Sequence, residues 1–276
     1  MKNYWIIFLF LCLAFSISSE TPLAKKKPNL VKLEGLEFKV QESENFVIHF
    51  RGPQKDAEFL QREIDKFYSI QYSKFFTTPL AVKISIILFK DKREYISKTK
   101  VPQDYQAHFE PKAKRILTFS NTQPGAIFHE LIHAWLDFNS VSNTRQLWFE
   151  EGFASFFESP EKISEGEWRF DKPNWRMESA KGKWTNLKSF MQTIDLRENH
   201  SKGEARLIFL WLSKNQLLEQ FVGKYHENLD FDTSGIDAIQ EIVGKNIDEI
   251  DFEIQNFKAE IENVPGSPSN KKLDLE

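Results

Sequence analysis

Alternating apolar and polar positions in the first half of the chain predict short β-strands. Within Ala81–Phe89, apolar residues recur two apart from Val82 to Leu88, so they would share one face of a strand. Further strands are expected over Phe46–Phe50 and Arg115–Phe119, and apolar residues at helical spacing predict helices over Gln54–Phe76 and Asp91–Thr99.

The second half of the chain has helical spacing almost throughout. Apolar residues recur at helical intervals from Pro124 to Phe138, and a proline suits the first turn of a helix. Ser201 and Glu204 have the spacing of a capping box, which predicts that a helix begins there and runs through Trp211. Other helices are expected over Leu147–Glu158, Asn215–Glu227, Ser234–Val243 and Ile247–Ile261, whereas Glu161–Lys183 shows no regular pattern. The expected fold class is α+β, with a small mixed N-terminal sheet and its helices followed by a helical C-terminal half.

The N-terminus has the pattern of an export signal. Lys2 precedes an apolar run from Tyr4 to Ile17, and small residues follow, as in a secretory signal peptide over residues 1–18. Cys12 also permits a bacterial lipoprotein signal, so a lipid anchor on Cys12 is the alternative. We expect a linker at 19–35, an α+β subdomain at 36–144, a helical subdomain at 145–262 and a flexible tail at 263–276.

Composition narrows the class of protein. The 276 residues include 37 Lys and Arg against 40 Asp and Glu, a net charge of −3, whereas nucleic-acid binders usually carry a basic excess. The apolar run near the N-terminus is shorter than the ~20 residues that a membrane-spanning helix needs. Cys12 is the only cysteine, so the mature chain is expected to lack disulfides. We therefore expect a protein that is secreted, periplasmic or part of the cell envelope, without a membrane span and without a nucleic-acid partner.

The segment His129-Glu130-Leu131-Ile132-His133 has the spacing of a metal site on a helix. Histidines four apart share one helix face, so both imidazoles can bind one ion, and Glu130 can stand beside a water on that ion. Two imidazoles leave a tetrahedral ion short of a protein ligand, and a carboxylate from a following helix can complete the set. Glu150 and Glu151 are adjacent in that helix, and their spacing alone leaves both open.

Two segments of the sequence, HELIHAW and WFEEGFASFFE, resemble the gluzincin zinc peptidases and, more narrowly, their peptidase MA-like group. The second segment is also similar to the glutamate–glycine helix of the aminopeptidase N family. These motifs cover Phe128 to Glu158, with a weaker likeness back to Phe38. The resemblance implies a Zn²⁺ ion bound by His129, His133 and Glu151.

The same resemblance assigns roles to the carboxylates around the ion. It makes Glu130 the general base, and it implies that Glu158 orients a ligand histidine, since Glu158 lies seven residues beyond Glu151 on the same face. Asp137, four residues past His133, either holds an imidazole in the same way or caps the end of its helix.

The chain departs from this family in two places. Its strand at Arg115–Phe119 lacks the glycine-x-methionine-glutamate-asparagine motif of the aminopeptidases, so aminopeptidase specificity is not expected. The family also places a tyrosine or histidine in the helical half as a donor to the developing oxyanion. Because no tyrosine occurs between Tyr105 and Tyr225, His200 is the candidate for this catalytic role.

The function expected from the sequence is that of an exported zinc metallopeptidase, of endopeptidase type, with a peptide or protein substrate. We expect that substrate to lie extended along the strand Arg115–Phe119, at the edge of the sheet. One alternative is a non-catalytic zinc-containing scaffold or binding protein of the cell envelope, which the missing tyrosine favours. A further alternative is hydrolysis of another amide, such as one in a cell-wall peptide.

Overall fold

The computed structural model describes residues 30–33, 35–139, 145–164, 167–193, 196 and 199–262. The expected signal peptide at 1–18, with Cys12, and the expected tail at 263–276 lie outside the described residues. The linker expected at 19–35 is wrong at its end. There Leu30–Leu33 form strand β1, which pairs antiparallel with β2 (Leu36–Glu42).

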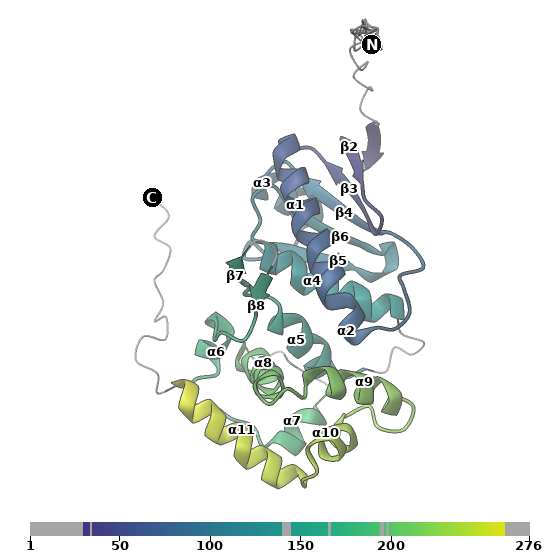
Figure 1. Cartoon of the computed structure of the whole chain (residues 1–276). Coiled ribbons are helices and arrows are strands. Elements are labelled where there is room, and N and C mark those ends of the chain that lie inside the picture. The colour runs from purple at the N-terminus through teal and green to yellow at the C-terminus, as the bar shows by residue number, and fades with distance from the viewer. Residues whose placement is uncertain are drawn as a thin grey trace, which may run out of the picture.

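Six of the described strands form one mixed sheet in the order β1-β2-β3-β4-β6-β5 (Figure 1). Its parallel centre consists of β3 (Phe46–Phe50), β4 (Ile84–Phe89) and β6 (Arg115–Phe119), which confirms the strands predicted there. The prediction for β4 was wrong at its start. Pairing with β3 begins only where Phe46 meets Ile84, so Val82 lies outside the sheet and is 51% exposed.

An unpredicted strand, β5 (Ala107–Glu110), forms one edge of this sheet. It pairs antiparallel with β6, to which it is joined through a short 3-10 helix at Pro111–Ala113. The predicted edge position of Arg115–Phe119 is therefore wrong, because β6 is flanked by β4 and β5.

Helices cover both faces of the sheet, because the apolar side chains of β4 point to both sides. Ile86 packs in the main core, beneath α1 (Gln54–Phe67) and α4 (Pro124–Asn139). Ile87 packs on the opposite face in a smaller core with Tyr95, which belongs to the helix that follows β4. The predicted helix at Asp91–Thr99 is confirmed: α3 spans Lys92–Thr99, and the Asp91 side chain caps it by accepting a hydrogen bond from the Glu94 N–H.

The long helix expected over Gln54–Phe76 contains a π-helical turn. After α1, residues Tyr68–Tyr72 form this turn, and α2 (Ser73–Phe75) completes the segment. Tyr68 and Tyr72 both make edge-on ring contacts with Trp135 of α4. The segment therefore packs along the helix that carries the two histidines of the motif.

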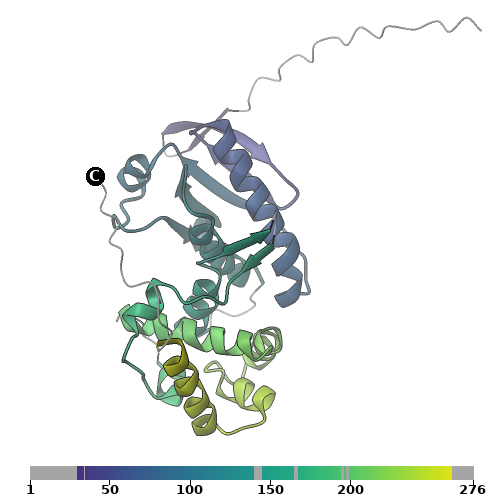
Figure 2. The same ribbon diagram turned by 60° about the vertical axis from the view of Figure 1, so that its left-hand side comes forward.

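The second half of the chain is helical, as predicted (Figure 2). Its helices are α5 (Leu147–Phe156), α6 (Trp175–Ser179), α7 (Leu187–Met191), α8 (Asn199–Lys214), α9 (Leu218–Asn228), α10 (Ile236–Val243) and α11 (Ile247–Glu262). None of the described helices combines the length and apolar composition needed to cross a lipid bilayer.

Two sequence predictions fail in this half. The segment Glu161–Lys183 has regular structure, since β7 (Glu161–Ser164) and β8 (Glu167–Arg169) form a hairpin and α6 follows. The capping box is also wrong, because α8 already includes Asn199. Instead of capping its own helix, the buried Glu204 carboxylate accepts a hydrogen bond from the Thr185 N–H, at 2.6 Å.

One apolar core runs from the sheet into the C-terminal helices. Phe67 of α1 stacks on Phe128 of α4 with ring centroids 4.0 Å apart, and Phe149 of α5 stacks on Tyr225 of α9 at 3.8 Å. Buried residues from β3 through to α11 belong to the same cluster. The boundary expected at residue 144 therefore does not separate two independent cores.

Candidate metal centre

Close packing at glycines brings α4 and α5 together. A Cβ atom on Gly125 of α4 would lie 1.8 Å from the Glu158 carbonyl oxygen, just beyond the end of α5. A Cβ atom on Gly152 of α5 would lie 2.7 Å from the ring of Phe209 on α8. Only glycine allows these approaches, because any other residue would clash with a neighbouring helix. α5 is thereby held between α4 and α8, with Glu151 on the side of the histidines.

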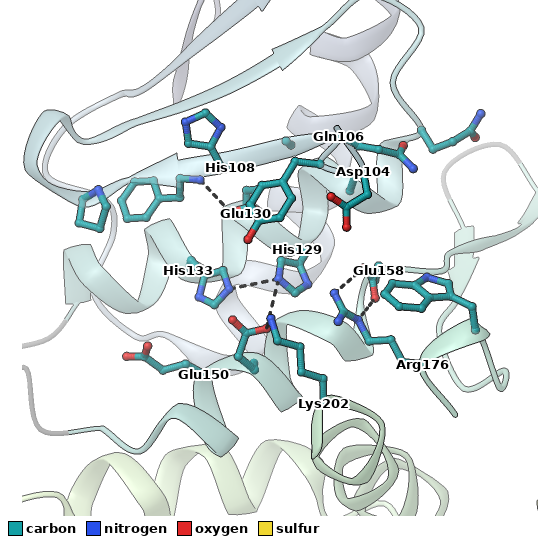
Figure 3. A pocket seen from close by; sticks show the side chains of 18 of the residues that line it. Asp104, Gln106, His108, His129, Glu130, His133, Glu150, Glu158, Arg176 and Lys202 are labelled. Carbon is teal, nitrogen blue, oxygen red and sulfur yellow. Dashed lines mark hydrogen bonds and ion pairs between the residues drawn. The ribbon is translucent and has the colours of Figure 1, made fainter. Parts of the chain in front are cut away.

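The candidate ligand atoms lie close together, and Figure 3 shows the His129 and His133 rings side by side. The Nε2 atoms of His129 and His133 lie 3.2 Å apart, and Glu151 Oε2 lies 3.9 Å from His129 Nε2. One ligand atom from each residue falls within 4.8 Å of the others. Two imidazole nitrogens bound to one tetrahedral Zn²⁺ would be separated by roughly 3.3 Å, so the histidine pair already has a suitable spacing.

A buried carboxylate oxygen in this group also fits a site for an ion. Glu151 Oε2 is buried beside the two imidazoles, and Lys202 Nζ lies 3.0 Å from it as an ion pair. Burying a carboxylate oxygen is costly unless cations or hydrogen-bond donors surround it, and an ion between Glu151 Oε2 and the two Nε2 atoms would do so. His129 Nδ1 is also buried without a hydrogen-bond partner among the described residues, but it is the ring nitrogen that faces away from this group and would not bind the same ion.

The electrostatic surroundings favour the protonation states that bind a metal. Burial, reinforced by the neighbouring His133, lowers the pKa of His129 well below its ordinary value, so this imidazole is neutral at pH 7. Burial acts to raise the pKa of Glu151, but His133 and Lys202 outweigh it and the net shift is downward. A neutral imidazole and an ionised carboxylate are the forms that coordinate divalent cations.

The carboxylate of Glu130 lies beside the ligands and contacts the edge strand. Its Oε2 accepts a hydrogen bond of 2.8 Å from the Phe109 N–H of β5. Burial raises its pKa, although His133 and this hydrogen bond oppose the shift. A carboxylate whose pKa is raised toward neutrality is better suited to take up a proton and return it than an exposed one.

These groups line a cavity of about 1,420 Å³ between the sheet and the helical half. On one side lie Ala107, His108 and Phe109 of β5, and on the other lie Trp175 and Arg176 of α6. Small-molecule sites usually measure ~300–1,000 Å³. The cavity is therefore larger than is usual for a site that binds one small molecule.

Two predicted supporting carboxylates do not contact the imidazoles. Glu158 lines the cavity, but it forms a bidentate ion pair with Arg176, whose Nη2 lies 2.8 Å from Glu158 Oε1. Asp137 also lines the cavity, and no hydrogen bond joins it to either imidazole of the described chain. The predicted contact by which Glu158 would orient a ligand histidine is therefore not made in this structure, because Glu158 pairs with the guanidinium of Arg176.

His200 does not reach the cavity, so the candidate oxyanion donor was misplaced. It lies 3.9 Å from Glu204 on its own helix, whereas Lys202 of the same helix lines the cavity. Residues two apart on an α-helix are about 200° apart around its axis, so His200 and Lys202 face opposite ways. Lys202 was not singled out from the sequence, where it appears only within the predicted capping box Ser201–Glu204.

Two further residues of the cavity were not singled out from the sequence. Arg176 comes from a segment in which no helix was predicted, and Phe109 comes from the unpredicted strand β5. The ambiguity between the adjacent glutamates is also resolved geometrically. Glu150 pairs with Arg145 at 2.9 Å, whereas Glu151 faces the histidines.

Comparison with known proteins adds no relative to this picture. No family model matches the chain, and no curated protein shows significant similarity to it. The assignment of a function therefore depends on the motif and on the geometry of the cavity.

Proposed function

We propose that this protein is a zinc-dependent metallopeptidase of the gluzincin type that hydrolyses internal peptide bonds. The observation that carries the proposal is the convergence of His129, His133 and Glu151, with Glu130 beside them, in a cavity bordered by an edge strand. A histidine pair four residues apart is common, and the addition of a third candidate ligand and an adjacent proton acceptor favours this chemistry.

The donor set supports zinc over the other common divalent ions. His129, His133 and Glu151 would hold the ion through two nitrogens and one oxygen, the set found in catalytic zinc sites that keep a position for water. Calcium and magnesium prefer oxygen ligands alone. When bound, zinc polarises a carbonyl group and lowers the pKa of water to ~7.

Glu130 moves the proton in the proposed reaction. Its carboxylate takes one proton from the attacking water while the water oxygen forms a bond to the carbonyl carbon of the substrate. It then gives this proton to the amide nitrogen as the carbon–nitrogen bond breaks, which releases an amine and a carboxylic acid. The raised pKa of Glu130 suits both the uptake and the return.

The edge strand β5 supports an extended peptide as the substrate. β5 pairs with β6 on one side, and three of its four residues line the cavity. A peptide can add to such an edge through backbone hydrogen bonds, which gives affinity without a preference for one sequence. In this proposal the substrate binds along β5, and not along β6 as the sequence predicted.

Metal analysis and a peptide screen test this proposal. Purified protein should contain about one zinc per chain, and cleavage of a mixed peptide library should stop with a chelator and return with zinc. Glu130→Gln should abolish cleavage with zinc still bound. Glu260→Gln is the control, since Glu260 is exposed and pairs with Lys214 away from the cavity. Full activity in Glu130→Gln would refute the assigned role.

A non-catalytic metal-binding scaffold of the cell envelope is the second candidate. The observation in its favour is that the Phe109 N–H already occupies Glu130 Oε2. A stoichiometric metal content together with no chelator-sensitive cleavage of any peptide would favour this scaffold over a peptidase.

Export remains part of the proposal. The basic start and apolar run at residues 1–18 favour secretion or a place in the cell envelope. The N-terminus of the processed protein tests it. A start near residue 19 supports cleavage of a signal peptide, whereas a lipid on Cys12 would indicate an anchored form.

A further inference from the structure

Three cations line the cavity among the described residues, and each pairs with a glutamate. Arg145 pairs with Glu150 at 2.9 Å, and Arg176 pairs with Glu158 at 2.8 Å. Lys202 differs from both, because its partner, Glu151, is also the candidate third ligand of the metal.

Glu151 cannot bind a divalent cation and keep a full-strength ion pair with Lys202 at the same time. A carboxylate oxygen bound to a doubly charged ion attracts a second cation less strongly, and the ion itself repels the ammonium group. Occupation of the metal site would therefore weaken the contact of 3.0 Å between Lys202 Nζ and Glu151 Oε2. Arg145 and Arg176 would keep their partners, since neither Glu150 nor Glu158 belongs to the ligand group.

The backbone that carries Lys202 is held firmly, so a released ammonium group would stay near the cavity. A Cβ atom on the next residue, Gly203, would lie 2.2 Å from the Arg176 carbonyl oxygen, which shows how closely α8 packs on α6. The Lys202 side chain is 35% exposed and lines the cavity. Its long, flexible stem can move Nζ by a few ångströms without moving the helix.

Glu130 and Lys202 lie on opposite sides of His129 (Figure 3). A substrate carbonyl placed between the helices would thus have a proton acceptor on one side and a cation on the other. When water adds to that carbonyl, its oxygen gains negative charge. A cation already in place stabilises this charge without having to be reorganised.

We propose that Lys202 is a catalytic residue that donates a hydrogen bond from Nζ to the carbonyl oxygen of the scissile bond. This role rests on the proposed peptidase function. Lys202 would bind Glu151 in the metal-free protein and the substrate oxygen in the metal-loaded protein. The ion pair described above is then the resting position of the ammonium group.

Three variants test this role: Lys202→Met, which keeps the stem and removes the charge, Lys202→Arg, which keeps the charge, and Lys214→Met as the control. Lys214 lies on the same helix and pairs with Glu260 on the surface. For each variant, zinc affinity is measured by competition with a chromophoric chelator, kcat and KM are measured on a neutral peptide, and folding is checked by thermal unfolding.

We expect Lys202→Met to bind zinc as tightly as the wild type or more tightly, since a competing positive charge is gone. Its kcat should fall about 100-fold, the usual effect of losing one oxyanion donor, with KM changed less than about threefold. Lys202→Arg should recover part of the lost kcat, and Lys214→Met should match the wild type in every measurement.

Other outcomes overturn the role of Lys202. Lower zinc affinity in Lys202→Met would show that the lysine only positions Glu151. Unchanged kcat, or a rise in KM alone, would show that it does not act on the scissile bond. Cleavage by the wild type with full activity in Lys202→Met refutes the lysine alone, whereas no cleavage by the wild type refutes the proposed function with it.

Discussion

Replacing Gly152 with alanine tests whether α5 and α8 pack as closely as the structure shows. The added Cβ atom would lie 2.7 and 2.8 Å from two ring carbons of Phe209 and 3.0 Å from the Ala205 carbonyl oxygen. Carbon atoms in contact are normally ~3.5–4.0 Å apart, so α5 and α8 would have to separate by roughly 0.8 Å. Phe209 is fully buried and has no free space to move into.

The net effect follows from two opposing contributions. Overpacking of this kind costs ~1–3 kcal/mol, and alanine gains up to ~1 kcal/mol over glycine within a helix. We expect a loss of about 1–2 kcal/mol in the free energy of unfolding, which lowers Tm by about 2–8 °C. Because Glu151 precedes Gly152, the shift of α5 should also weaken zinc binding by about tenfold.

Thermal unfolding and zinc titration measure both effects, and Gly223→Ala is the matched control. Gly223 lies within α9, and a Cβ atom there would meet nothing within 4 Å. The same substitution should therefore stabilise the protein at that position by about 0.5–1 kcal/mol. If Gly152→Ala raised Tm as Gly223→Ala does, the close packing of α5 on α8 would be refuted.

Three other predictions concern the metal, pH and a buried carboxylate. Zinc should raise Tm, and a chelator or Glu151→Gln should remove the increase; equal stabilisation of Glu151→Gln would contradict the ligand assignment. Burial lowers the pKa of His226 to about 4, whereas the same imidazole in the unfolded chain titrates near 6.5. As the pH falls below 6.5 the unfolded chain takes up this proton first, so the free energy of unfolding decreases, by about 3 kcal/mol at pH 4. His226→Phe should reduce the change in the free energy of unfolding between pH 7 and pH 4. An unreduced change would contradict the burial effect. Asp251→Ala should lower the free energy of unfolding, measured with urea, by about 2–4 kcal/mol, because it leaves the Trp184 and Leu187 N–H donors without their acceptor. A decrease below about 0.5 kcal/mol would show that water replaces the carboxylate.

The histidine pair of the candidate site could be predicted because helical spacing places both residues without knowledge of the fold. His129 and His133 share a face through their spacing alone, and the sequence pattern also predicts that they lie on a helix. The choice of Glu151 over Glu150 needed the resemblance at the sequence level, and the structure shows the reason, since Arg145 holds Glu150. The three strands β3, β4 and β6 were likewise predictable from their apolar runs.

The rest of the site depends on tertiary contacts that local pattern does not encode. β5 has only four residues, too few to show a clear alternation, and it is a strand because it pairs with β6. Glu204 has the spacing of a capping residue, yet its carboxylate accepts a hydrogen bond from the N–H of Thr185, which lies outside its helix. Lys202 faces the cavity because α8 packs closely on α5 and α6, and these contacts are not encoded in the local pattern.

The continuous core has a consequence for how the protein is made. A chain synthesised only through α5 already contains His129, His133 and Glu151, but Phe209 and Tyr225, which pack against α5, follow much later. A nascent chain on the ribosome would therefore carry all three side chains without the scaffold that holds them together. The three side chains would come together only after α8 and α9 have been made and have packed against α5.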